Sequence, residues 1–283
     1  VKVKSANILL KFEKPAPAEL MAQGQALASE IDLDLAWEFA PDEEFGFADL
    51  ARDYFSESAT LAQQAGAHLT VQAAAMRYNI PGTLIGDFGV AFVATENRRI
   101  TSLAKRFGEL ARTSAALAGV NATVDTPELI YAELGGWLVS QARVHDLTVL
   151  DLEQDAAERD RGLIEAALFD SGRPVIIVPP GVETFAAGRI LIAWDGSATA
   201  ARAVAEVRPF LAGAEVEILS VTGEKDLSSF VAGAELAPHL ARHGAAVSVR
   251  NVSLAPGQDV AEAIRMAAAE FGADLIVCGA YKH

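Results

Sequence analysis

The segment Arg189–Trp194 reads R-I-L-I-A-W, and the turn residues Asp195–Ser197 (D-G-S) follow it directly. A short apolar run that ends at a turn is typical of a strand buried in a parallel sheet. Apolar residues then recur at helical spacing through Ala198–Leu211, and Gly213 stands where such a helix would end. This order of strand, turn and helix predicts the first β-α unit of an α/β domain.

The same alternation continues to the end of the sequence. Further strands are predicted at Val216–Val221, Ala246–Val252 and Leu275–Cys278, with helices at Ala234–His243 and Asp259–Phe271 between them. Alternating strands and helices predict a parallel sheet with right-handed crossovers and helices on both faces. In open sheets of this kind, ligands bind at the carboxyl ends of the strands.

An internal repeat indicates that the chain contains two copies of this unit. Gln64–Val71 resembles Leu211–Ile218, since both run from a helix end through a glycine into a strand. Val144–Leu150 likewise resembles Gly272–Cys278. We therefore expect two domains, residues 1–182 and 188–283, joined by a linker within Pro179–Gly188.

The first copy has its own predicted elements. They are helices at Phe47–Gln64, Leu129–Val144 and Ala156–Phe169 and a fifth strand at Pro174–Val178. Because the repeat spacing is longer here, a long loop is predicted around Arg77–Phe92. Within residues 1–46, strands are predicted at Ser5–Phe12 and Ile31–Phe39, and Leu35–Glu38 weakly resembles Ile192–Asp195.

The second copy is expected to be incomplete. The sequence reaches His283 before a counterpart of the last helix and fifth strand of the first copy. An uncovered strand at Leu275–Cys278 would expose its hydrogen-bonding edge. We expect this edge to be covered by Ser5–Leu10 or by a second chain.

Composition and charge restrict the class of protein. The 283 residues are 51% hydrophobic and 22% charged, which is typical of a globular chain with a sizeable core. The net charge of −15 disfavours nucleic acid as a partner. The single cysteine, Cys278, excludes an internal disulfide and suits the cytoplasm. No apolar run approaches the roughly 20 residues of a membrane helix, so no membrane association is expected.

Three segments resemble universal stress protein domains. Ile190–Ser197 resembles the first strand and turn of that family, Ala273–Tyr281 the fourth strand and the start of its glycine loop, and Ser171–Pro179 the fifth strand. With the repeat, the resemblance covers Phe47–His283. It implies two tandem Rossmann-like (adenine nucleotide alpha hydrolase-like) domains with five-stranded parallel sheets, and a ligand-sensing or scaffold role in the stress response.

The resemblance also implies a nucleotide site in the second copy. Some family members bind ATP at the end of the first strand, beside the second strand and in a glycine loop after the fourth. The matching positions are those expected to contact ATP, ADP or AMP with its magnesium: Asp195, Gly196, Ser197, Val221, Gly279 and Ala280. Glycines let backbone N–H groups approach phosphate oxygens.

Two departures from the family pattern bear on this site. Lys282 stands where the loop of ATP-binding members has its second glycine. In the first copy, Asp151 with Glu153 and Asp155 occupies the corresponding segment, and these carboxylates would repel a triphosphate. The first copy is therefore not expected to bind ATP.

Alternative functions and structural roles stay open. The protein could be an interaction dimer without nucleotide, or an ATP-hydrolysing enzyme on the same scaffold. No catalytic motif is present, so neither catalytic nor metal-ligating residues are predicted. Asp195 and Ser197 could simply cap a helix, Trp194 is expected in the core, and Cys278 is expected to be an inert buried thiol. His239 and His243 share a helix face, a spacing that only weakly indicates zinc.

Overall fold

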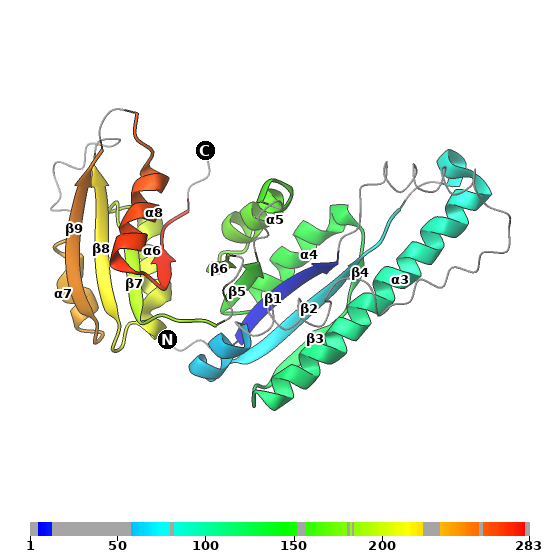
Figure 1. The fold of residues 1–283 in the computed structure, drawn as a ribbon, viewed down its shortest axis with the longest axis horizontal. Coiled ribbons are helices and arrows are strands. Elements are labelled where there is room, and N and C mark those ends of the chain that lie inside the picture. The colour runs from blue at the N-terminus through cyan, green and yellow to red at the C-terminus, as the bar shows by residue number, and fades with distance from the viewer. Residues whose placement is uncertain are drawn as a thin grey trace. The chain divides into compact units, whose positions relative to one another are not determined.

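The computed structural model describes residues 5–12, 58–79, 82–151, 157–179, 182, 184–222, 233–254 and 257–280. The chain divides into two compact units, Lys4–Thr184 and Phe185–His283. In each unit, helices lie against a parallel sheet (Figure 1). The α/β fold class predicted from the alternation of strands and helices is therefore confirmed.

The first strand of the chain, β1, lies in the middle of the sheet of the first unit. The strand order of this sheet is β3-β2-β1-β5-β6, and a short strand β4 also pairs with β2. All of these pairs are parallel. After β1 the chain forms the strands on one side of it, β2 to β4, and then crosses over to form β5 and β6 on its other side. The strands are β1 Ser5–Phe12, β2 His68–Met76, β3 Ala122–Asp125, β4 Glu128–Leu129, β5 Leu147–Asp151 and β6 Val175–Val178.

Helices cover both faces of this sheet. Helix α3 (Gly82–Leu117) packs on one face, where Ala75 contacts Ile100 and Ala104. Helices α4 (Tyr131–Arg143) and α5 (Ala157–Asp170) pack on the other face, in a core formed by Ala74, Met76, Leu134, Leu138, Leu150, Leu163 and Ala167. Neighbouring residues of β2 therefore enter two separate cores, because successive side chains of a strand point to opposite faces.

The second unit repeats this plan. Its sheet has the order β10-β7-β8-β9, again with parallel pairs only. The central strand β7 corresponds to β1, and its neighbours β8 and β10 correspond to β2 and β5. The strands are β7 Arg189–Ala193, β8 Glu215–Thr222, β9 Ala246–Ser253 and β10 Leu275–Val277.

The helices of the second unit also lie on both faces. Leu191 and Leu219 face α8 (Val260–Phe271), while Ile190 and Ile192 point to the opposite core. That opposite core contains residues of α6 (Ala198–Val207), of the 3₁₀ turn Arg208–Phe210 and of α7 (Leu236–Ala241). Within the described ranges of both units, no helix combines the length and apolar character needed to cross a membrane.

The first strand of the chain has a different role from the one expected. Ser5–Phe12 is the central strand of the first sheet, paired with β2 on one side and β5 on the other. The expectation that Ser5–Leu10 covers the edge at Leu275–Cys278 is therefore wrong, because both edges of this strand are already hydrogen-bonded. The segments Ile31–Phe39 and Leu35–Glu38, and most of Phe47–Gln64, lie outside the described residues; residues 58–65 are helical.

The predicted loop at Arg77–Phe92 is also wrong over most of its length. Helix α3 begins at Gly82 and continues for 36 residues. Glycines in its first turns suggested a loop, since each costs about 1 kcal/mol relative to alanine in a helix. Further along, Ile100, Ala104, Phe107, Ala111 and Ala115 form a stripe that is almost fully buried. Burial of an amphipathic face stabilises a helix more than local propensity does.

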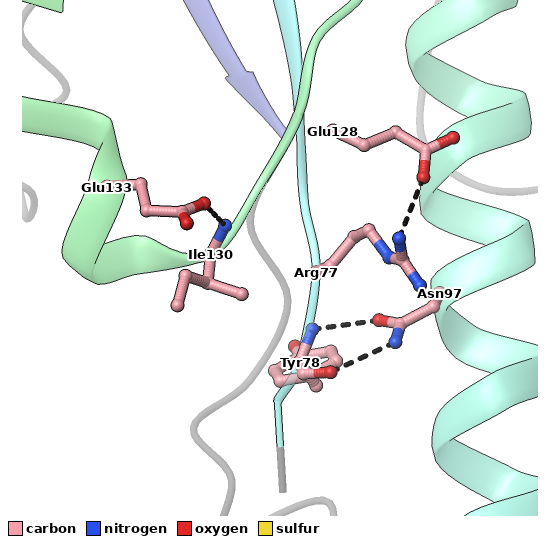
Figure 2. A network of polar contacts seen from close by, with 6 residues as sticks. All are labelled: Arg77, Tyr78, Asn97, Glu128, Ile130 and Glu133. Atoms are coloured by element: carbon pink, nitrogen blue, oxygen red, sulfur yellow. Dashed lines mark hydrogen bonds and ion pairs between the residues drawn. The ribbon is translucent and has the colours of Figure 1, made fainter. Parts of the chain in front are cut away.

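Asn97 fastens α3 to the end of β2. Its side-chain amide donates to the carbonyl oxygen of Tyr78 at 3.0 Å, and its oxygen accepts from the Tyr78 N–H at 2.8 Å. Figure 2 shows this two-bond bridge between the helix and the chain that leaves the strand. The amide thus satisfies both backbone groups of one residue and sets the distance between helix and sheet.

Replacement of Asn97 by alanine should therefore loosen this contact. Loss of both hydrogen bonds is expected to lower the free energy of unfolding by about 1–3 kcal/mol. Urea denaturation followed by circular dichroism measures the loss, and hydrogen exchange should show faster exchange in β2 and α3. Thr95→Ala, an exposed change on the same helix, should alter stability by less than about 0.5 kcal/mol. Equal stability of the two variants would contradict the structural role of Asn97.

Candidate functional site

The carboxyl edge of the second sheet gathers the residues predicted to bind a nucleotide. Strand β7 runs into Asp195–Ser197, β8 carries Val221 near its end, and β10 runs into Gly279 and Ala280. Because β8 and β10 flank β7 in parallel, these three chain segments emerge at the same edge. The topology therefore brings all six predicted residues to the carboxyl ends of the strands, at the same end of the sheet.

The turn after β7 is held by its own side chains. The Ser197 N–H donates to Oδ1 of Asp195 at 2.9 Å, and Gly196 adopts a φ of 74°, which favours glycine. Oγ of Ser197 accepts from the Ala200 N–H at 3.1 Å and caps α6. Of the two residues considered as helix caps, Ser197 is therefore the cap and fixes where the helix begins, while Asp195 holds the turn before it.

Gly279 packs directly on this helix end. A Cβ atom added to Gly279 would lie 2.7 Å from the Ala200 nitrogen, 2.8 Å from Oγ1 of Thr199 and 2.9 Å from its carbonyl carbon. No other residue type fits at these distances, since the nearest atoms belong mainly to backbone. The glycine found by sequence thus allows the end of β10 to touch the first turn of α6.

The remaining predicted contacts are partly engaged in packing. Val221 is half-buried and packs against the α8 core, with Val252 and Ile264 nearby. Ala280 follows Gly279 and is also half-buried. Trp194 packs against the opposite core, as predicted. One face of Val221 is thus committed to the core, which leaves only its partly exposed side for a ligand.

Sequence reasoning missed Ser220 at this edge. Its side chain is fully buried, and its hydroxyl donates to the carbonyl oxygen of Trp194 at 3.0 Å. The Trp194 N–H in turn donates to the carbonyl oxygen of Leu219 at 2.8 Å. These bonds tie the end of β7 to β8 just before the turn. The feature of the sequence that could have indicated this role is a serine within an otherwise apolar strand.

The prediction that Cys278 is a buried thiol is wrong. Its side chain is exposed, as is that of Ile276 two residues earlier. Residues two apart share one face of a strand, and at β10 the described residues leave this face accessible. The apolar run Leu275–Cys278 suggested burial on both faces, which holds for central strands and fails at this edge strand.

Other candidates from the sequence do not assemble into a site. The rings of His239 and His243 meet edge to face, with their centroids 5.0 Å apart. Over the described ranges, no three His, Cys, Asp or Glu side chains are grouped closely enough to hold a metal ion. In the first unit Asp151 ends β5, while Glu153, Asp155 and Lys282 lie outside the described residues.

A buried polar layer in the first unit was also missed. Nδ1 of His145 lies 2.8 Å from the carbonyl oxygen of Gln141, and Nε2 lies 2.8 Å from Oγ1 of Thr70. A carbonyl can only accept, so Nδ1 carries a proton and donates it to Gln141. Gln72, fully buried on the same face of β2, contacts Gln141. The layer fixes α4 on the sheet, and its members on β2, Thr70 and Gln72, are buried.

The two glycines of the edge should respond differently to substitution. Gly279→Ala is expected to cost about 1–3 kcal/mol through overpacking, and Gly196→Ala about 1–2 kcal/mol through its left-handed backbone. Asparagine tolerates that backbone but is larger. Gly196→Asn should therefore be milder than Gly196→Ala, and Gly279→Asn worse than Gly279→Ala. Urea denaturation with hydrogen exchange of α6 and β10 measures both series; the same order at both positions would refute the assignment.

Comparison with known proteins places the fold. No family model matches the chain, and no curated protein matches it. Among solved structures, a universal stress protein from Archaeoglobus fulgidus DSM 4304 superposes with a TM-score of 0.56 at 15% sequence identity, covering 96% of this chain and 83% of that one. At this identity the likeness is one of fold. The chain thus has an α/β fold similar to that of a universal stress protein.

Proposed function

We propose that the chain is a tandem protein of the universal stress class whose second unit binds an adenine nucleotide. One observation carries the proposal: Gly279 after β10 touches Thr199 and Ala200 in the first turn of α6, the helix that follows the Asp195–Ser197 turn at the end of β7. The likeness of fold supports it, because open parallel sheets bind ligands at this edge.

The chemistry of this edge suits a phosphate-bearing ligand. The Ala200 N–H is capped by Ser197, and the Ala201 N–H bonds within the helix. The N–H groups of Ala198 and Thr199 precede them at the positive end of the helix dipole, which attracts anions. Because Gly279 has no side chain, its backbone can also come close to a phosphate. The Asp195 carboxylate, an acceptor only, suits ribose hydroxyl donors.

The proposed role is ligand sensing or scaffolding in a stress response, without turnover. Among the residues that the structure describes at this edge, no nucleophile is paired with a general base, and the side chains of Asp195 and Ser197 are engaged in the turn and the helix cap. The first unit serves as a structural partner that binds no ATP, consistent with an acidic residue at the end of β5. Release of phosphate from ATP with magnesium would instead support the enzyme alternative.

Asp195→Ala should weaken ATP binding by roughly tenfold or more while the protein stays folded. Asp195→Asn keeps an acceptor for the Ser197 N–H and so separates loss of charge from loss of the turn. Glu206→Ala removes one exposed carboxylate from α6 and is the matched control, with affinity expected within about twofold. Isothermal titration measures binding, and mass spectrometry of the denatured protein identifies bound nucleotide.

Two results would contradict the nucleotide proposal. One is wild-type protein that releases no nucleotide and shows no heat on ATP titration. The other is an affinity that Asp195→Ala leaves unchanged, which would remove this residue from the site. Either result shifts attention to the second candidate function.

The second candidate is self-association through the edge of the second sheet. Within the described residues, β10 pairs with β7 alone, and Ile276 on this strand is 45% exposed. A strand edge with unpaired backbone groups and an apolar side chain can add a strand from another chain. This observation favours a dimer in which β10 meets the same strand or another of a second copy.

Ile276→Lys should disrupt such a dimer, because a charge at the edge opposes strand pairing. Sedimentation velocity over a range of concentrations is expected to show a dimer for the wild type and a monomer for the variant. Met266→Lys, which replaces a comparably exposed apolar residue on α8, is the control and should leave the dimer intact. A wild type that is monomeric throughout, or equal loss in both variants, would rule out this interface.

A further inference from the structure

A groove in the first unit runs beside the middle of α3. Its volume is about 790 Å³, within the usual range of about 300–1,000 Å³ for ligand pockets. It lies where α3 passes the ends of β2 and β4, away from the predicted nucleotide contacts, all of which belong to the second unit. The described lining residues are Arg77, Val90, Val93, Ala94, Asn97, Arg98, Thr101, Ser102, Lys105 and Glu128.

The charge of this groove opposes that of the whole chain. Its described lining residues include three cationic side chains and one carboxylate, in a protein whose net charge is −15. Arg77 is paired with Glu128 at 3.0 Å. Figure 2 shows this pair. Arg98 donates to Oγ1 of Thr95 at 3.0 Å. In the part of the chain that the structure describes, neither Arg98 nor Lys105 forms an ion pair, so both charges are available to a ligand.

The hydrogen-bond donors follow one face of the helix. Arg98, Thr101, Ser102 and Lys105 are spaced three, one and three residues apart, so they line the groove over two helical turns, about 10 Å along the axis. Val90, Val93 and Ala94 continue the same face toward the start of α3. The groove thus offers a donor-rich half and an apolar half.

The base of the groove is held by backbone pairing. Strand β4 pairs with β2, and the Arg77 N–H donates to the carbonyl oxygen of Leu129 at 2.7 Å. The Asn97 bridge to Tyr78 then holds the helix against this corner (Figure 2). Because these bonds form within the protein, binding a ligand does not have to order them.

We propose that this groove binds a small phosphate-bearing molecule. Arg98 and Lys105 pair with the anionic oxygens, Thr101 and Ser102 donate their hydroxyls, and the apolar wall takes the uncharged part of the ligand. A tetrahedral phosphate presents acceptors in several directions, which suits four donors spread over two turns better than a flat carboxylate does. This is a second anion site, separate from the proposed nucleotide edge.

Inorganic tripolyphosphate is the probe, titrated calorimetrically into the full chain. The double variant Arg98→Gln with Lys105→Gln should weaken binding by roughly tenfold or more, and binding should weaken as salt rises. The control double variant, Arg112→Gln with Arg202→Gln, makes the same change in net charge at exposed positions outside the groove. Its affinity should stay within about twofold of the wild type.

The result is separable from the nucleotide proposal. Asp195→Ala should leave tripolyphosphate binding to the groove unchanged, even if it abolishes binding of ATP. A wild type that does not bind tripolyphosphate at low salt would overturn the groove proposal. So would an equal loss of affinity in the two double variants, because that would reflect net charge alone.

Discussion

The parallel pairing of one central strand in each unit determines the rest of the structure. Strands β1 and β7 each have a parallel neighbour on both sides. Parallel neighbours cannot be joined by a tight turn, so each connection must cross a face of the sheet, and helices fill those crossings. The same constraint places all carboxyl ends at one edge, which is why residues 80 positions apart meet beside α6.

Sequence reasoning succeeded where local pattern and tertiary packing agree. Arg189–Ala193, the turn at Gly196 and the helix end at Gly272 lie as predicted, because an apolar run, a left-handed glycine and a buried face all indicate the same elements. The candidate nucleotide-binding residues of the second unit likewise lie at the carboxyl ends of neighbouring strands, as the alternation of strands and helices predicts. What the pattern could not give was the close contact of Gly279 with Thr199, since that distance depends on how strand and helix pack.

The failures have physical causes as well. The start of α3 carries glycines that indicate a loop, and only the buried stripe from Ile100 to Ala115 shows why it is a helix. Cys278 lies in an apolar run, yet exposure depends on which strand stands at the edge. The groove lined by Arg98 and Lys105 has no recognisable motif in the sequence. Its residues lie on a common face only because α3 is one continuous helix, which the sequence did not predict.

The length of α3 sets it apart from the sheet that supports it. At 36 residues it extends about 54 Å, whereas the nine residues of β2 extend about 30 Å. Among the side chains of α3 that the structure describes, the almost fully buried ones begin at Ile100, and Asn97 bonds to Tyr78 just before that point. Helix formation is cooperative, so the buried half of α3 also stabilises the turns that come next to Asn97. A molecule bound in the groove along this part of α3 would stabilise the helix there. Local stability of the helix and affinity for the ligand would then be thermodynamically coupled, so that a change in one changes the other.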